Sequence, residues 1–206
     1  AIYIPFPNAF PSRWVIDFDA CNRCGECVKV CPTSAILLEQ KPSVKALEVS
    51  AIVLSTGFQE ATPTFYGEYG YGKYPGVLTS TELERLLSSM GPTLGEFQGA
   101  PGKVAFIQCV GSRDKDFPYC SYACCMYAMK EAYCLLDMFP DVQITFFYMD
   151  LRTPGKGYYT YAEELKNRGV RFVRTRVPAV EEGNEGRLAL KYEAEDGKIC
   201  REEFDI

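Results

Sequence analysis

The 206-residue sequence contains no histidine. That absence excludes the commonest general base, every Ser–His or Cys–His catalytic pair and most catalysis at zinc. Long hydrophobic runs are missing too, because no stretch approaches about 18 consecutive apolar residues. No signal peptide precedes the first expected strand, so we expect a soluble chain. The chemistry left open is mainly electron movement, in which a cofactor supplies the reactive group.

Positive charge is also scarce. Lys and Arg number 22 against 27 Asp and Glu, which gives a net charge of −5. This balance argues against nucleic acid and against an anionic membrane as partners. The ten cysteines do not indicate a disulfide framework, because a chain of this length has enough apolar residues for a core of its own. We therefore expect a cytoplasmic protein of one large or two small domains whose thiols bind metal.

Four of the cysteines lie in one short run that reads CNRCGECVKVCP over 21–32. They are Cys21, Cys24, Cys27 and Cys31. The C-x2-C-x2-C-x3-C-P spacing is typical of a [4Fe–4S] cluster in bacterial ferredoxins, where a short loop and one helical turn direct the sulfurs and Pro32 ends the helix. Zinc sites separate two C-x2-C pairs by a long spacer, so zinc and a disulfide are the weaker alternatives. No second run of this kind is present, so we assign Cys31 to the same cluster.

A second cysteine group surrounds an expected strand–helix junction. Its members are Cys109, Cys120, Cys124 and Cys125. Cys109 lies at the carboxyl end of a strand, where doubly wound sheets bind their ligands. Cys120 and Cys124 share a helix face, and the positive helix amino terminus favours an anionic cluster there. The spacing is not a standard ferredoxin pattern, and buried, inert cysteines remain the alternative. We interpret Cys134 as a core residue and Cys200 as unliganded.

Hydrophobic patterning in the second half predicts an α/β fold. Strands alternate with helices in the order β-α-β-α-β, which implies a parallel sheet with right-handed crossovers, followed by a hairpin. The strands are expected over 103–110, 142–149 and 170–177, the helices over 120–138 and 159–167, and the hairpin over 188–195 and 198–204.

The first half is expected to be less regular. Residues 1–15 suit an edge strand and a loop, and 15–41 form the cluster module, with one short strand before Cys21 and another over 35–38. Further expected elements are strands over 44–49 and 51–54, an ordered loop over 59–78, and a helix that starts at a capping box of Thr79 and Glu82 and ends at Gly91-Pro92. A linker over 95–102 marks the expected domain boundary.

These segments resemble the A subunit of heterodisulfide reductase. The resemblance covers nearly the whole chain and rests on the 21–32 run together with AIYIPFP (1–7), YGYGKYP (69–75), VAFIQCVGSRD (104–114), YCS (119–121), CCMYAMK (124–130), FYMD (147–150) and GKG (155–157). It implies a thioredoxin-reductase-like flavoprotein core that binds FAD and carries an inserted ferredoxin module. It also implies a second [4Fe–4S] cluster, on Cys109, Cys120, Cys124 and Cys125.

Three flavin contacts follow from the same resemblance. Ser55-Thr56-Gly57 corresponds to the turn that closes the flavin site, so Thr56 and Gly57 are expected there, and Lys130 falls where the family has a basic residue beside the flavin ring. The alternative for Lys130 is an exposed helical lysine.

The implied domains are 1–14 with 42–102 as a remnant of the FAD domain, 15–41 as the ferredoxin module, and 103–206 as a Rossmann-like domain. The family's G-x-G-x-x-G half is missing, so we expect a fragment or a split subunit.

The resemblance implies electron transfer between FAD, clusters and partner subunits, in some family members with electron bifurcation. The implied partners are subunits B and C, a hydrogenase or formate dehydrogenase, or a ferredoxin, and a homodimer is also allowed. Two other functions stay open. One is a non-catalytic electron-wire or docking subunit. The other is an NAD(P)H-dependent flavoenzyme in which Asp150 holds a ribose hydroxyl, although Gly155-x-Gly157 follows the second strand instead of the first.

Overall fold

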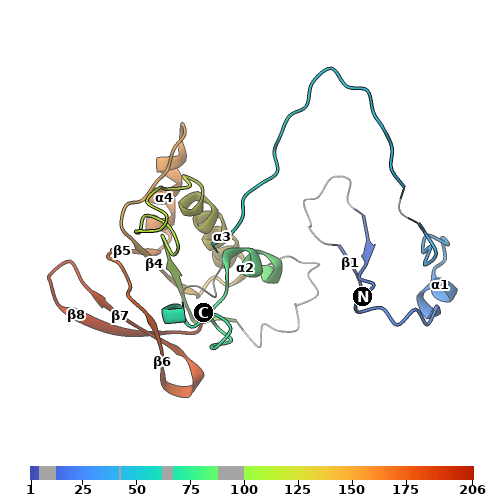
Figure 1. The fold of residues 1–206 in the computed structure, drawn as a ribbon. Coiled ribbons are helices and arrows are strands. Elements are labelled where there is room, and N and C mark those ends of the chain that lie inside the picture. The colour runs from blue at the N-terminus through green and yellow to red at the C-terminus, as the bar shows by residue number, and fades with distance from the viewer. Residues whose placement is uncertain (5–12, 42, 62–66, 88–99) are drawn as a thin grey trace. The chain divides into compact units, whose positions relative to one another are not determined.

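The computed structural model describes residues 1–4, 13–41, 43–61, 67–87 and 100–206, and these form two compact units, 1–59 and 60–206 (Figure 1). The three-part domain division drawn from the sequence refers to parts of a longer flavoprotein, and it stays a prediction. Within the described residues, no helix combines the length and the apolar character needed to cross a membrane.

The first unit contains a small antiparallel ladder and one short helix. Strand β1 (Ile2–Tyr3) pairs with β2 (Val15–Ile16), which confirms the short strand expected before the cysteine run. Helix α1 (Glu26–Val30) follows Gly25, whose φ of 77° is in the left-handed region that glycine favours. It ends at Cys31 in an extended conformation, as the following proline requires.

The other strands expected in this unit are not formed. Residues 35–38 and 43–59 have no regular secondary structure, so the strands predicted over 35–38, 44–49 and 51–54 are wrong for this chain. A strand needs a neighbour for its N–H and C=O groups, and β2 is paired with β1 instead. Large apolar side chains of the 43–59 segment are left in solvent, for example Val44 at 100% and Val53 at 87% exposure.

The second unit is built on a three-stranded parallel sheet. Its strands β3 (Lys103–Ile107), β4 (Gln143–Tyr148) and β5 (Arg171–Arg174) lie in the order β3-β4-β5. Helix α3 (Cys124–Met138) connects the first two strands and α4 (Tyr158–Asn167) the last two, which confirms the predicted β-α-β-α-β order. The sheet follows from the apolar runs in β3 and β4, where Phe106 and Phe146 stack at 4.7 Å between ring centroids.

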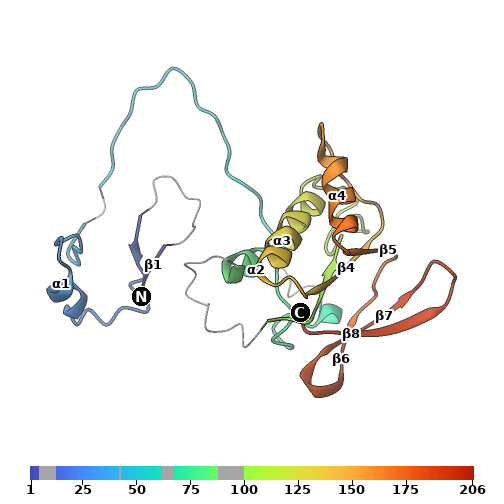
Figure 2. The same ribbon diagram turned by 180° about the vertical axis from the view of Figure 1, so that it is seen from behind.

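The two faces of this sheet carry different layers (Figures 1 and 2). Phe146 faces one core, which it shares with α3, α4 and α2 (Ser80–Leu87). Phe147 faces the other core, which it shares with the antiparallel sheet of β6 (Val180–Glu182), β7 (Leu188–Glu193) and β8 (Ile199–Phe204). The β7–β8 hairpin confirms the prediction, whereas β6 was not foreseen because its sequence, VEE, has a single apolar residue.

Several boundaries differ from those expected. Strand β3 ends at Ile107 because Cys109 has a left-handed φ of 63°, and α3 begins at Cys124 because Tyr122 has a φ of 60°. The predicted capping box is formed, since Thr79 Oγ1 accepts from the Glu82 N–H at 3.2 Å and a Glu82 carboxylate oxygen accepts from the Thr79 N–H at 2.8 Å. The expected end at Gly91-Pro92 lies outside the described residues, as does most of the 95–102 linker. Short 3-10 turns occur at Gly67–Tyr69 and Asn184–Gly186.

Candidate iron–sulfur sites

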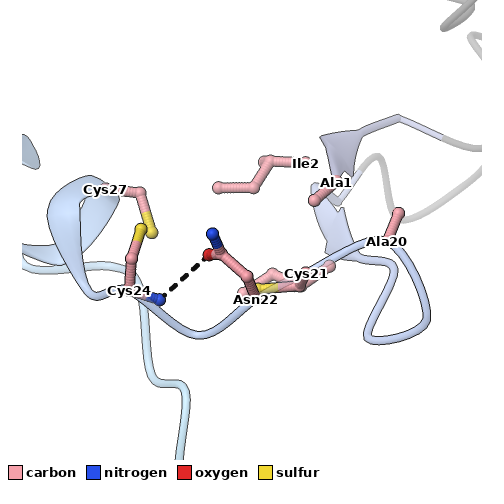
Figure 3. A pocket seen from close by; sticks show the side chains of 8 residues that line it. Ala1, Ile2, Ala20, Cys21, Asn22, Cys24 and Cys27 are labelled. Atoms are coloured by element: carbon pink, nitrogen blue, oxygen red, sulfur yellow. Dashed lines mark hydrogen bonds between the residues drawn. The ribbon is translucent and has the colours of Figure 1, made fainter.

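The first cysteine run folds as a curled loop followed by α1. Arg23 and Gly25 have φ values of 57° and 77°, and these two left-handed residues turn the chain between successive cysteines. The Asn22 carboxamide oxygen accepts a hydrogen bond from the Cys24 N–H at 3.1 Å, which fixes the start of the turn (Figure 3). Cys21, Cys24 and Cys27 line one cavity of about 330 Å³. The remaining lining residues are Ala1, Ile2, Ile16, Ala20 and Asn22.

Cys31 is not among the residues that line this cavity. Its sulfur lies 3.6 Å from the Thr33 hydroxyl and accepts a hydrogen bond from the Ala35 N–H at 3.4 Å. The Thr33 hydrogen bond, followed by that of Ala35, lowers the pKa of Cys31 below that of an ordinary thiol. Donors of this kind stabilise a thiolate, which is the form that binds iron.

The second cysteine group is assembled by the loop between β3 and α3. Tyr119 closes this loop, because its carbonyl accepts from the Ser112 hydroxyl at 2.7 Å and from the Arg113 N–H at 3.2 Å. The loop thereby brings Cys120 back toward Cys109.

Helix α3 begins at the other two cysteines of this group. Cys124 is partly buried and Cys125 is 2% exposed, with its sulfur 4.0 Å from the carbonyl oxygen of Asp150, two residues after β4. Cys120, just before the helix, accepts a hydrogen bond from the Tyr122 N–H at 3.4 Å through its sulfur. The carboxyl ends of two neighbouring parallel strands and the start of α3 therefore meet at this group.

The four thiols of this group interact electrostatically. Burial raises the pKa of Cys109, and negative charge on Cys124 and Cys120 raises it further, while Arg113 opposes the shift. A hydrogen bond with Cys125 lowers the pKa of Cys124, and the same hydrogen bond raises the pKa of Cys125. Four thiolates this close repel one another unless a cation lies between them.

The donor sets of both groups fit a [4Fe–4S] cluster in chemistry. Each supplies four cysteine thiols, which are the ligands that iron–sulfur clusters use, and all eight are free of disulfides. In the described part of the chain, no set of three or more His, Cys, Asp or Glu side chains lies in a geometry ready to hold a metal ion. The structure thus gathers three thiols around one cavity and four around one strand–helix junction, and the ligand assignments stay predictions.

Lys130, one of the expected flavin contacts, is held in place on α3. Its Nζ lies 2.8 Å from a carboxylate oxygen of Glu84, on α2, and Tyr127 donates a hydrogen bond to the same carboxylate. Burial by itself would raise the pKa of Glu84, but the hydrogen bonds from Lys130 and Tyr127 outweigh it and lower that pKa. Lys130 is therefore not a free surface lysine, and Glu84 is a partner that sequence reasoning missed.

Thr56 and Gly57, the other expected flavin contacts, lie in the exposed 43–59 segment. Gly57 has a φ of 77°, which a turn at this position requires. They belong to the first unit and Lys130 to the second, so these contacts stay predictions.

Glu131, the residue after Lys130, is a buried acid that sequence reasoning also missed. Its side chain is 1% exposed, and neither carboxylate oxygen forms a standard hydrogen bond among the described residues, with the Ser80 side chain only a weak partner. Burial, followed by the charge of Glu84, raises the pKa of Glu131 to about 9. Its position three residues after Ala128 and four before Leu135, both core residues, was the available sign that it faces inward.

Asp150, the residue on which the nicotinamide hypothesis depended, is engaged elsewhere. Its carboxylate lies 2.8 Å from Arg113, 3.2 Å from Arg152 and 3.6 Å from Arg174. A carboxylate surrounded in this way is not free to hold a ribose hydroxyl, so the structure gives that hypothesis no support. Of the two cysteines placed outside both groups, Cys134 is only partly buried, and Cys200 packs against the second core.

Residues 14–37 match a 4Fe–4S binding domain. This match covers the cysteine run, the short strand before it and helix α1, and it confirms the ferredoxin-type module predicted from the spacing. The chain therefore contains a ferredoxin-type module of the kind that binds a 4Fe–4S cluster.

Nearly the whole chain is similar to known proteins. The chain is 44% identical, over 94% of its length, to the A subunit of the ferredoxin/F(420)H(2)-dependent CoB–CoM heterodisulfide reductase of Methanosarcina acetivorans, of which it covers 25%. It is 40% identical over its full length to the A subunit of the H(2):CoB–CoM heterodisulfide,ferredoxin reductase of Methanothermobacter marburgensis, and 45% identical to an iron–sulfur A subunit of the CoB–CoM heterodisulfide reductase of Methanopyrus kandleri, covering 33% of each. The chain thus spans a quarter to a third of these relatives, and it is a partial chain similar to the heterodisulfide reductase A subunit.

Proposed function

We propose that the chain is the electron-transferring segment of a heterodisulfide-reductase-like A subunit, which relays electrons between FAD, two [4Fe–4S] clusters and partner subunits. The observation that carries the proposal is the presence of two separate groups of four thiols in a chain related over its whole length to that subunit. The ligands are Cys21, Cys24, Cys27 and Cys31 for one cluster and Cys109, Cys120, Cys124 and Cys125 for the other. When bound, each cluster accepts and releases single electrons.

The exposed apolar segment supports a larger flavoprotein core. Residues 43–59 carry Val44, Leu47, Val49, Ile52, Val53, Leu54 and Phe58, all more than 60% exposed. A run of this kind is stable only when covered by further protein, because each large side chain left in water forfeits roughly 1.5–3 kcal/mol of burial. We infer that a thioredoxin-reductase-like FAD domain completes it, with 1–14 and 42–102 as its remnant, 15–41 as the inserted module and 103–206 as the Rossmann-like part.

Lys130, paired with Glu84, is the residue that we propose to interact with the flavin ring. Glu84 holds the Lys130 ammonium in one place, and the hydrogen bond between them raises the pKa of Lys130, so the lysine stays charged. A fixed cation beside a flavin ring would favour the reduced, more negative form. Thr56 and Gly57, in the 43–59 segment, are proposed as two further contacts of the flavin.

The proposed partners are other redox subunits in the cytoplasm. They are subunits B and C, a hydrogenase or formate dehydrogenase, or a ferredoxin, with a homodimer as a further assembly. The alternative, an electron-wire or docking subunit without flavin chemistry, is favoured only if Lys130 has no effect on a flavin.

A Lys130→Met variant of the flavin-loaded protein separates these functions. In a spectroelectrochemical titration we expect its flavin to be at least about tenfold harder to reduce than that of the wild type. For a two-electron couple this corresponds to a reduction potential about 30 mV lower. Lys166→Met is the matched control, because Lys166 is also 45% exposed and paired with a glutamate on its own helix. Equal flavin potentials in the two variants would favour the electron-wire function.

A further inference from the structure

Three arginines converge on one carboxylate at the carboxyl ends of the parallel strands. Arg113 and Arg152 lie 2.8 and 3.2 Å from Asp150 Oδ2, and Arg174 lies 3.6 Å from Oδ1. Through hydrogen bonds at these distances the Asp150 carboxylate anchors the guanidinium groups of Arg113 and Arg152. Three positive charges against one negative charge leave an excess of positive charge at this edge of the sheet.

Two of these arginines also border the second cysteine group. Arg113 follows Cys109 by four residues in the same tight loop, where both have left-handed φ values of 59° and 63°, and its guanidinium lies beside the Cys109 thiol. The backbone N–H of Arg152 approaches the Cys125 sulfur. Arg174 is directed differently, since its side chain is 68% exposed and donates to the Met149 carbonyl at 3.0 Å.

Arg113 and Arg152 each have a buried N–H donor that lacks a standard hydrogen bond among the described residues. These donors are Arg113 Nη1 and Arg152 Nε, and the acceptor that the Arg113 guanidinium approaches is the Cys109 sulfur. Buried donors of charged groups are almost always paired, so an unpaired one calls for an acceptor that completes the site. An iron–sulfur cluster supplies such acceptors, because its sulfides and thiolate sulfurs accept hydrogen bonds.

We propose that Arg113 and Arg152, anchored by Asp150, are positioning residues that set the reduction potential of the cluster on Cys109, Cys120, Cys124 and Cys125. The inference rests on the proposed function, which assigns a cluster to these cysteines. A cluster on four thiolates is anionic, and its reduction adds one electron to that charge. Fixed cations and N–H donors beside it stabilise the reduced form and therefore raise the potential.

The test is an EPR-monitored redox titration of the anaerobically purified protein and three variants, with iron measured on each sample. In Arg113→Met the second cluster should be at least about tenfold harder to reduce, which is about 59 mV for one electron. In Arg113→Lys the potential should lie between those of Arg113→Met and the wild type, because lysine restores the positive charge but not the planar guanidinium with its several N–H donors. Arg174→Met is the matched control and should shift the potential by less than half as much, although it binds the same carboxylate.

The outcomes separate the inference from the function beneath it. If the wild-type protein shows no second cluster, the proposed function fails and the inference falls with it. If the second cluster is present in all samples and Arg113→Met leaves its potential unchanged, or shifts it no more than Arg174→Met does, only the inference is overturned. If Arg113→Met loses the second cluster altogether, the test is the reduction potential of that cluster in Arg113→Lys. A potential equal to that of the wild type would contradict a role for the guanidinium donors.

Discussion

A Cys124→Ala variant is expected to lose about four irons per chain and one of two EPR signals, while the signal of the ferredoxin-type cluster stays. The reason lies in the local geometry, since Cys124 begins α3 beside Cys125 and interacts electrostatically with Cys109. Removal of one ligand leaves three thiols to hold the cluster. The measurement is iron content with EPR of the reduced protein, purified without oxygen.

Cys134→Ala is the matched control for this prediction. Cys134 lies further along the same helix, is also partly buried, and is assigned to neither cluster. It should keep the full iron content and both signals. Unchanged iron in Cys124→Ala, or an equal loss in Cys134→Ala, would show that the second cysteine group does not hold a cluster.

The second large effect concerns the buried acid on α3. A Glu131→Gln variant should unfold with a much flatter pH dependence than the wild type between about pH 5 and 8. In the folded chain the pKa of Glu131 is raised to about 9, from an ordinary value of 4.5, so the folded state keeps a proton that the unfolded state releases. The contribution of Glu131 to the free energy of unfolding of the wild type is therefore fully present below pH 4.5. It is lost as the pH rises toward 9, by up to about 1.4 kcal/mol per pH unit.

Glutamine keeps the shape and remains neutral, so the variant should be more stable than the wild type at pH 8 and similar near pH 4. Urea unfolding of the reduced, metal-free chain at several pH values measures this difference. Glu163→Gln is the control, because that residue forms an exposed ion pair with Lys166, which lowers its pKa, and it stays charged across the window. Parallel stability curves for wild type and Glu131→Gln would mean that Glu131 is ionised in the folded protein.

Features that depend on neighbouring residues were predictable from the sequence. The cysteine run, the capping box at Thr79 and the apolar runs of β3 and β4 depend on spacing within one turn or one strand, and each was found where expected. The expected 44–49 and 51–54 strands failed because their β propensity is local, whereas a strand partner comes from elsewhere in a fold.

The surroundings of the second cysteine group were predictable only in part. Its four cysteines stand out in the sequence, but the arginines reach Asp150 from the β3–α3 loop, from the loop after β4 and from the end of β5. Their convergence depends on the register of β3, β4 and β5, which no local pattern fixes. Glu84 meets Lys130 for a similar reason, through the packing of α2 on α3.

Iron content combined with EPR of the reduced wild-type chain shows directly whether two separate clusters occupy this chain. With both clusters bound, we expect about eight irons per chain and two distinct signals. About four irons with a single signal would contradict the second site, and zinc in place of iron would contradict both.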